Sequence, residues 1–278
     1  MILVTWNMQG AHSSADLPAS RPTAAAPAAV PAGAPPKKRG TKRKRGDVDT
    51  SNLATVLDLF KQKKTDVICL QEAGACPRYI GGTAGVSNGV RYTYGRYESG
   101  SSTGSSTGTS IASRKSSRAC TQLTVYFMWF DTGLHGGRSN NRCSMAILSK
   151  EKPVAYNIVK MASATLRPMI GMQLGSGQWV YCIHAPSGNH KSASGVANAL
   201  LNKIKGTKYV CAGDFNCSPL DMSTRGHHPV YSQYVTHQGG NSLDFAIANG
   251  CRLRTANDAI ADSTVLISDH FSQTFEVT

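Results

Sequence analysis

Acidic residues are scarce in this sequence. Its 278 residues include 16 Asp and Glu against 30 Lys and Arg, which gives a formal net charge of +14. This positive balance favours a polyanionic partner, either nucleic acid or an acidic membrane surface. No stretch approaches the roughly 18 apolar residues of a membrane span, so a transmembrane segment is not expected. The first residues lack a basic leader, a long apolar core and a cleavage site, so no signal peptide is expected.

The sequence also lacks any Cys-x-x-Cys pair among its eight cysteines, which argues against a zinc ribbon. Cys69, Cys182 and Cys211 lie in apolar, strand-like runs, where a free thiol behaves as a small hydrophobic side chain. One or two disulfides are compatible with the whole set of cysteines. The sequence leaves their pairing open.

Hydrophobic residues make up 40% of the chain, enough for one core, and we expect a single domain over residues 1–278. Two stretches stand apart from it. Residues 12–49, rich in Ala and Pro and then in Lys and Arg, are predicted to be a disordered insertion, and residues 99–115 a flexible loop. The insertion carries seven basic residues within nine positions, which predicts a nuclear localisation signal or a nucleic-acid-binding arm, with a solvated charge run as the alternative. These basic residues are Lys37, Lys38, Arg39, Lys42, Arg43, Lys44 and Arg45.

Apolar runs predict more strands than helices. Residues 2–7 and 66–72 read as buried strands on either side of an amphipathic helix at residues 53–60, which is typical of a βαβ unit. Further strands are predicted at residues 123–130, 145–148, 169–174, 179–183, 243–247 and 273–277. Because strands dominate, we expect an α/β (α+β) fold with two packed β-sheets flanked by helices.

The run of residues 209–216 carries the most informative pattern. Residues 209–212 predict a buried strand of about four residues, which Gly213 would end. Asp214 and Asn216 then follow two positions apart, so at strand spacing both side chains would point to the same side. Open α/β sheets bind ligands at such strand ends. An Asx-type turn is the alternative interpretation of the same residues.

Four other predicted strands also end in, or lie beside, polar groups: Asn7, Glu72, His184 and the pair Asp269-His270. Taken singly, each could be a cap, a surface carboxylate or a core histidine. Taken together, they suit phosphoester hydrolysis. Asp, Glu and Asn oxygens are ligands for Mg²⁺ or Ca²⁺, and a histidine paired with a carboxylate is a natural general base. Arginine side chains could clamp a phosphate.

Five motifs occur in the order typical of a known group of enzymes. The chain resembles the endonuclease/exonuclease/phosphatase superfamily, typified by deoxyribonuclease I, and more narrowly the catalytic B subunits of cytolethal distending toxins. This resemblance implies a four-layer sandwich of two mixed β-sheets flanked by helices. The five motifs are residues 5–10, 70–74, 213–216, 243–246 and 268–271, and the narrower match adds residues 167–171 and 236–238.

The resemblance also implies catalytic roles. His184 is similar to the family's first catalytic histidine, which acts on the leaving group or the scissile phosphate. His270 is similar to the general base that activates water, and Asp244 to the carboxylate that orients a histidine. Asp214 and Asn216 would hold water, phosphate or metal.

Metal and phosphate ligands follow from the same resemblance. Glu72 is similar to the principal metal carboxylate, and Asn7 and Asp269 would complete or support the ion site. The expected ion is Mg²⁺, with Ca²⁺ or Mn²⁺ as alternatives. Arg142 and Arg167 resemble the two arginines that grip substrate phosphate, although a loop charge or a surface ion pair would also account for them.

The implied function is that of a Mg²⁺-dependent DNA endonuclease with little sequence preference, the catalytic subunit of a genotoxin that damages DNA in a host-cell nucleus. Its partners would be DNA and toxin delivery subunits. The chain departs from this family in its basic insertion and in lacking the leader that exported subunits carry. The alternatives are a phosphoinositide phosphatase on the same fold and a non-catalytic protein that binds nucleic acid or another partner.

Overall fold

The computed structural model describes residues 1–8, 56–57, 59–60, 65–77, 80–98, 123–131, 143–160, 167–256 and 270–278. The predicted insertion at 12–49 with its basic run Lys37 to Arg45, the whole tract at 99–115, and the site candidates Arg142 and Asp269 lie outside these residues. Within them, no helix is long and apolar enough to cross a membrane. The seven cysteines that they include are free thiols, so none of these seven forms a disulfide.

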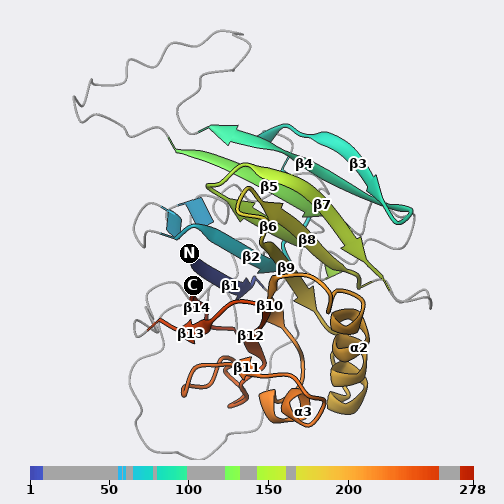
Figure 1. Cartoon of the computed structure of the whole chain (residues 1–278), viewed down its shortest axis with the longest axis vertical. Helices are drawn as coiled ribbons and strands as arrows, with labels where there is room; N and C mark the ends of the chain where they lie inside the picture. The colour runs from blue at the N-terminus through green and yellow to red at the C-terminus, as the bar shows by residue number, and fades with distance from the viewer. Residues whose placement is uncertain are drawn as a thin grey trace, which may run out of the picture.

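Two β-sheets pack face to face (Figure 1). Both are mixed, since β1 pairs with β2 and β9 with β10 in parallel, while the remaining pairs are antiparallel. The eight-stranded sheet has the order β13 (Leu253–Thr255), β14 (Gln273–Val277), β1 (Ile2–Asn7), β2 (Val67–Gln71), β6 (Met145–Ser149), β5 (Thr124–Phe130), β4 (Val90–Glu98) and β3 (Thr83–Ser87). The six-stranded sheet has the order β11 (Pro229–Val230), β12 (Asp244–Asn249), β10 (Tyr209–Asp214), β9 (Trp179–His184), β8 (Met169–Leu174) and β7 (Pro153–Val159).

Side-chain alternation along the strands creates the layers. In β1, Leu3 packs in the core between the sheets, whereas Val4 and Trp6 face the opposite side of the eight-stranded sheet. There they meet the helical residues Val56, Leu57 and Phe60. Successive strand residues point to opposite faces, so a continuous apolar run fills both a central and an outer layer. The predicted βαβ unit is thus present, with β1 and β2 parallel.

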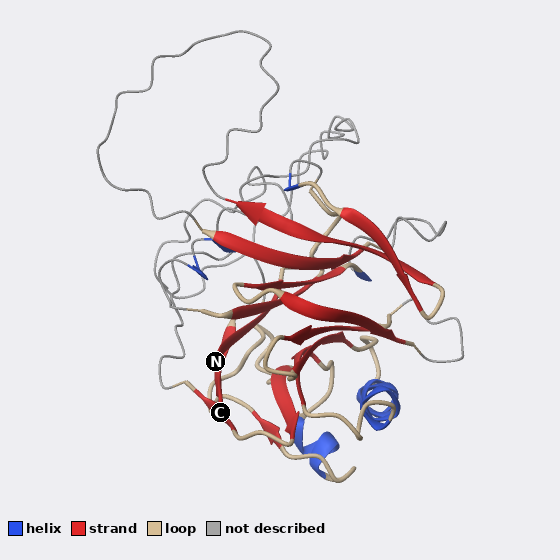
Figure 2. Ribbon diagram, turned by 45° about the horizontal axis from the view of Figure 1, so that its top comes forward, coloured by secondary structure: helices blue, strands red, loops and turns tan. Residues whose placement is uncertain are grey.

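Two helices cover the outer face of the six-stranded sheet, as Figure 2 shows. Helix α2 (His190–Asn202) begins at Asn189, whose side chain accepts hydrogen bonds from the amides of Lys191 and Ser192. Its buried face, including Ala197 and Leu201, packs against β9, β10 and β12, and α3 (Pro219–Ser223) adds Met222 to the same cluster. The expected architecture of two packed sheets flanked by helices is therefore confirmed.

Candidate active site

The inner face of the six-stranded sheet presents three polar side chains at one edge. Val210 and Ala212 of β10 pack in the central core, and the same alternation places Asp214 on this inner face. The strand register pairs Asp214 directly with His184 of β9 on one side and with Asp244 of β12 on the other. Three residues that are far apart in sequence thus lie side by side because three strands end or begin in register.

Gly213 does not end its strand, so this prediction was wrong: β10 continues through Gly213 to Asp214. The glycine serves a close approach instead. A Cβ at this position would lie 2.0 Å from the carbonyl oxygen of Ile183 on the neighbouring β9. Absence of a side chain lets β9 and β10 meet closely just where His184 and Asp214 follow.

The eight-stranded sheet provides a second group of polar side chains at the same edge. Asn7 ends β1 on the inner face, in alternation with Leu3. Glu72 follows β2 directly and has a φ of 51°, in the left-handed region that side chains with a Cβ rarely adopt. The sequence predicted Glu72 at a strand end, but it is this backbone conformation that directs its carboxylate toward the other site residues. Glu72 is only 5% exposed. Such strain is concentrated at functional sites.

Asp214 of the six-stranded sheet lies beside the polar side chains of the eight-stranded sheet. Its Oδ2 accepts hydrogen bonds from Nδ2 of Asn7 at 2.9 Å and from Nδ2 of Asn216 at 3.1 Å. His184 Nε2 lies 3.6 Å from the same oxygen and 4.0 Å from Oε1 of Glu72. The side chains of Asp214 and Asn216 come together, but not at strand spacing. β10 ends at Asp214, and Asn216 follows with a φ of 49° in an Asx-type turn, which was the alternative interpretation. This conformation also lets the Asn216 amide donate to Asp214 Oδ1 at 2.9 Å.

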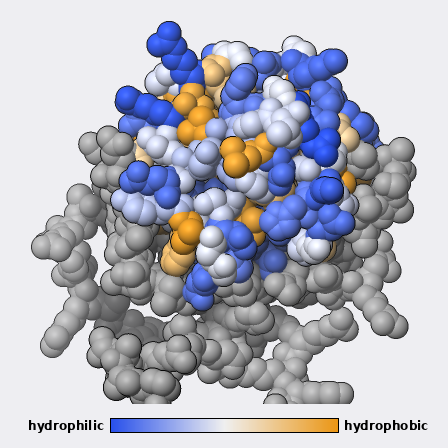
Figure 3. All heavy atoms as spheres, turned by 90° about the horizontal axis from the view of Figure 1, so that it is seen from below, coloured by the Kyte–Doolittle hydropathy of each residue, from blue (hydrophilic) through white to orange (hydrophobic). Residues whose placement is uncertain are grey.

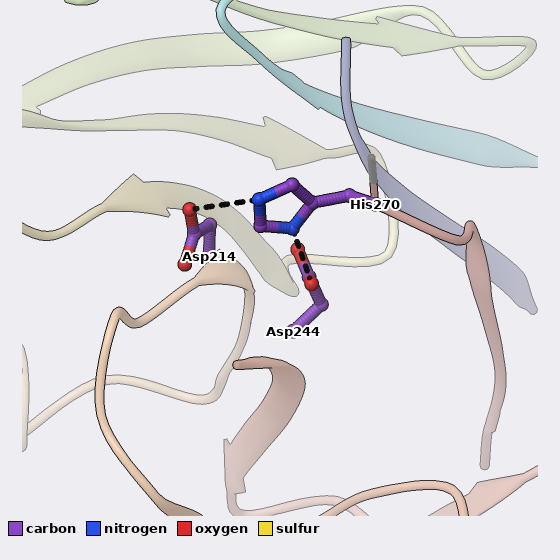
Figure 4. A group of neighbouring side chains, drawn as sticks. All are labelled: Asp214, Asp244 and His270. Atoms are coloured by element: carbon purple, nitrogen blue, oxygen red, sulfur yellow. Dashed lines mark hydrogen bonds and ion pairs between the residues drawn. The ribbon is translucent and has the colours of Figure 1, made fainter. Parts of the chain in front are cut away.

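His270 lies between two carboxylates (Figure 4). Its Nδ1 is 2.7 Å from Asp244 Oδ2, a hydrogen bond that fixes the orientation of the imidazole, while Nε2 faces Asp214 Oδ2 at 4.0 Å. That second distance exceeds a direct hydrogen bond. The ring of His237 packs edge-on against His270, with centroids 4.7 Å apart, and the two backbones form an isolated antiparallel bridge.

These side chains surround a cavity of about 300 Å³. It contains every described site residue that the sequence predicted except Asp244, which lies behind His270 and holds it. The cavity is lined by Asn7, Glu72, Arg167, His184, Ser187, Asp214, Asn216, His237, Leu243 and His270. Two of the three non-glycine residues with positive φ in the described chain, Glu72 and Asn216, are among them.

Arg167 is fixed at the cavity wall by the backbone. Its Nη1 donates to the carbonyl oxygen of Ala185 at 2.7 Å, and Nδ2 of Asn216 donates to that same oxygen at 2.8 Å. Ala185 directly follows His184, so its carbonyl oxygen holds Arg167 and the Asn216 side chain close to His184. A guanidinium held in this way is suited to binding an anion in the cavity.

The electrostatics of the cavity centre on Asp214. Burial and, after it, the neighbouring Asp244 raise the pKa of its carboxyl group to about 7, against the lowering effects of His270 and of hydrogen bonds from Asn216 and Asn7. Two buried carboxylates side by side repel each other, so a cation or a proton is favoured between them.

The donor set fits a hard divalent cation. Glu72, Asp214 and Asn7 offer carboxylate and amide oxygens, the ligands that Mg²⁺ and Mn²⁺ prefer. In addition, one ligand atom from each of Asp214, Asp244 and His270 lies within 4.8 Å of the others, all three side chains being buried. Because Asp244 already binds His270 Nδ1, a cation would fit better on the oxygen-rich side of the cavity.

Three lining residues were not predicted to be functional: Ser187, His237 and Leu243. His237 belongs to the motif at residues 236–238, which the sequence marked without a role. Its signal was weak because its contact with His270 depends on pairing between segments 33 residues apart, which no local pattern encodes.

A family model described as the endonuclease/exonuclease/phosphatase family matches residues 4–270. The chain belongs to the endonuclease/exonuclease/phosphatase family. A search of curated proteins found no match to the sequence. Membership in this family supports a hydrolase acting on phosphodiesters or phosphate monoesters.

Solved structures of cytolethal distending toxins share the fold of this family member. Those from Haemophilus ducreyi and Actinobacillus actinomycetemcomitans match over 99% of this chain and over 96% and 97% of theirs, with TM-scores of 0.64 and 0.63 and 20% identity. A structure of CdtB, described as the biologically active subunit of the toxin, matches over 99% of this chain and 96% of that one at 18% identity, with a TM-score of 0.64. The predicted resemblance is thus confirmed at the level of the fold.

Proposed function

We propose that this protein is a Mg²⁺-dependent DNA endonuclease with little sequence preference. The observation that carries the proposal is the Asp244–His270 pair, whose Nε2 lies 4.0 Å from Asp214 Oδ2 inside a cavity that is also lined by an arginine and a set of oxygen ligands. This is the arrangement that hydrolysis of a phosphoester requires: a base, an anion clamp and a place for a cation.

In the proposed mechanism, His270 Nε2 removes a proton from water as the water attacks phosphorus. Asp244 stabilises the resulting imidazolium through Nδ1, so His270 need not change its ring orientation. Asp214 orients the water, since its Oδ2 lies too far from Nε2 for direct contact but at a suitable distance for a bridge. Arg167 holds the non-bridging phosphate oxygens, and Asn216 keeps Asp214 and the Ala185 carbonyl in position beside it. As the bond from phosphorus to the leaving oxygen breaks, His184, buried beside Asp214, stabilises charge on the leaving group.

The metal would be held by Glu72, with Asn7 and Asp214 beside it and Asp269 as a further ligand. When bound, a divalent cation polarises the phosphoryl oxygen and stabilises the leaving alkoxide. The hydrogen bond from Asn7 Nδ2 fixes the orientation of the Asp214 carboxylate beside Glu72.

The net charge of +14 suits DNA and phosphoinositide alike, but the run Lys37 to Arg45 favours DNA, because its sequence predicts a nuclear localisation signal or a nucleic-acid-binding arm. A polybasic segment adds salt-sensitive affinity for duplex DNA. The same run supports targeting to the nucleus of a host cell, and the toxin-like fold supports the catalytic subunit of a genotoxin that delivery subunits carry into that cell. The family match over residues 4–270 supports one catalytic domain with this run on an insertion.

The proposal is tested by nicking of supercoiled plasmid with the wild type, His184→Ala and His270→Ala, in Mg²⁺ and in EDTA. We expect wild-type nicking to need Mg²⁺ and each substitution to lower its rate by about 10²-fold or more. His190→Ala, which removes an exposed histidine outside the cavity lining, should nick like the wild type.

Release of phosphate from phosphatidylinositol phosphates, measured on the same samples, separates the alternatives. Faster phosphate release than nicking would replace the proposal with the phosphatase. Plasmid binding without nicking in either Mg²⁺ or Mn²⁺ would favour the non-catalytic alternative.

A further inference from the structure

An aromatic segment borders the cavity. Six large hydrophobic side chains are exposed among the described residues, and three of them, Tyr231, Tyr234 and Val235, fall within five positions. Tyr234 is 60% exposed and Tyr231 is 43% exposed. We call residues 231–237 the rim segment. Clustered exposed apolar side chains mark binding sites more often than chance, because their exposure to water is unfavourable.

The rim segment is continuous with the active site. Its last residue, His237, lines the cavity and contacts the ring of His270. Thr236 is anchored to the start of β12, since its Oγ1 accepts hydrogen bonds from the amides of Leu243 at 2.8 Å and Asp244 at 3.0 Å. Leu243 also lines the cavity. The segment is therefore held against the site by the same residues that begin β12.

Tyr234 lies close to the cavity along the chain. Tyr234 is three residues before His237, so even a fully extended chain separates them by only about 10 Å. A strand of DNA advances about 3.4 Å for each nucleotide along the helix axis. A phosphate bound in the cavity therefore places the next few bases of its strand within reach of this rim.

The surface around the rim favours a polyanion. Residues 222–243 include no Asp or Glu, while they contain one arginine and three histidines. Figure 3 views the molecule from below, the end where Figure 1 places α3 and β11, and shows small hydrophobic patches separated by hydrophilic side chains. A small group of aromatic side chains on a segment without acidic residues, among hydrophilic neighbours, suits nucleic acid better than a broad apolar interface with another protein.

We propose that Tyr231 and Tyr234 form a stacking subsite for nucleobases of the strand whose phosphate occupies the cavity. This inference rests on the proposed function and deepens it, because it gives the nuclease a contact with bases that are unpaired, or that open out of the duplex, beside the bound phosphate. Every base presents a flat π face to a tyrosine ring, so the subsite needs no sequence preference. An inositol phosphate headgroup presents hydroxyl and phosphate groups instead, and has no such face.

The test compares two labelled oligonucleotides of 12 positions, one with bases and one with an abasic backbone throughout, by fluorescence anisotropy in EDTA so that no cleavage occurs. We expect Tyr234→Ala to weaken binding of the intact strand by about fivefold or more, and Tyr231→Ala combined with it to weaken it further. Binding of the abasic strand should change by less than about twofold, since its phosphates carry the electrostatic part. Tyr234→Phe keeps the ring and should bind like the wild type.

Val154→Ala removes an equally exposed hydrophobic side chain from β7 and serves as the matched control. Equal losses for the intact and the abasic strand, or no loss for either, would overturn the stacking subsite. It would also be overturned if Tyr234→Ala lowered binding to phosphatidylcholine vesicles containing a phosphoinositide but left the intact strand unaffected, because the rim would then bind lipid.

The outcome is independent of catalysis. If plasmid nicking fails but the difference between intact and abasic strands persists, the endonuclease proposal is wrong and the subsite stands. If nicking depends on His270 while Tyr234→Ala binds both strands like the wild type, the endonuclease proposal stands and the stacking subsite is wrong.

Discussion

The two sheets contribute to the site in different ways. The six-stranded sheet presents His184, Asp214 and Asp244 from three neighbouring strands in direct register. The eight-stranded sheet contributes Asn7 from a regular strand end and Glu72 from a residue with a φ of 51°. One side of the site is therefore fixed by ordinary strand pairing, and the other depends on a local backbone strain.

This difference determines what each side tolerates. A change that shifts β9 against β10 moves several groups at once, whereas a change at Glu72 acts on a single carboxylate. His270 joins the two sides, because it precedes β14 of the eight-stranded sheet but is hydrogen-bonded to Asp244 of the six-stranded sheet. The following substitutions test this contrast.

The largest effect is expected at the Asp244–His270 hydrogen bond, which connects the two sheets. In Asp244→Asn the side chain can donate to His270 Nδ1, which favours the tautomer with the proton on the wrong nitrogen for a base. We expect the kcat of plasmid nicking to fall by about 10²- to 10⁴-fold with little change in KM. Thermal unfolding should stay close to that of the wild type. Asp221→Asn, in the capping box of α3, provides a carboxylate control, and an equal fall in its kcat would contradict the assignment.

The second-largest effect is expected from a substitution that separates β9 from β10 in the six-stranded sheet. In Gly213→Ala the new Cβ meets the Ile183 carbonyl oxygen at 2.0 Å, so β9 and β10 must separate. Overpacking of this kind costs on the order of 3 kcal/mol, and it displaces His184 and Asp214 together. Urea denaturation should show this loss, along with reduced nicking. Gly195→Ala in α2, where nothing lies within 4 Å, should instead gain about 0.5–1 kcal/mol. Similar results for both variants would argue against the close approach.

The buried carboxylate predicts a dependence on pH. Burial and Asp244 raise the pKa of Asp214 from its ordinary value of 3.8 to about 7, so between these pH values the folded protein binds more protons than the unfolded chain. The free energy of unfolding should therefore fall as pH rises from 4 to 7. Denaturation in EDTA should show a shallower fall for Asp214→Asn. Mg²⁺ should stabilise the wild type most at high pH, and identical slopes for the two proteins would refute this prediction.

The smallest effect is expected from the backbone strain at Glu72, which follows β2 of the eight-stranded sheet. Glycine adopts the conformation of Glu72 freely, whereas alanine does not, so Glu72→Gly should be more stable than Glu72→Ala by about 1 kcal/mol. Both variants should lose Mg²⁺-dependent nicking because both lack the carboxylate. Equal melting temperatures would mean that residue 72 relaxes out of the left-handed region. Activity retained in either variant would remove Glu72 from the metal site.

The same contrast decides how much the sequence could predict. Buried strands such as β1, β2, β9 and β10 are continuous apolar runs, and a polar residue at the end of each marks the site. Because strand alternation is a local property, the convergence of Asn7, His184 and Asp214 follows from it once the sheets are packed. The family resemblance predicted that Asp244 orients a histidine, and the structure shows that this histidine is His270.

Other features depend on tertiary contacts. Strand β4 has mostly half-exposed residues and β3 is largely exposed, so neither forms the apolar run that predicts a strand. The φ angles of Glu72 and Asn216 are imposed by their neighbours, since neither residue type favours that conformation as glycine does. The position of His237 beside His270 arises from pairing of distant segments. Gly213, interpreted as a break, is required by contact with another strand.

The most direct test of a single site built from both sheets is a double-mutant cycle on plasmid nicking. It combines His184→Ala from the six-stranded side with Glu72→Gln from the eight-stranded side, whose side chains lie 4.0 Å apart. Groups that act as one unit are strongly non-additive, so the double variant should be about as slow as the slower single variant. Losses that multiply to the product of the two single effects would show that the two sides act independently, and would contradict a shared site.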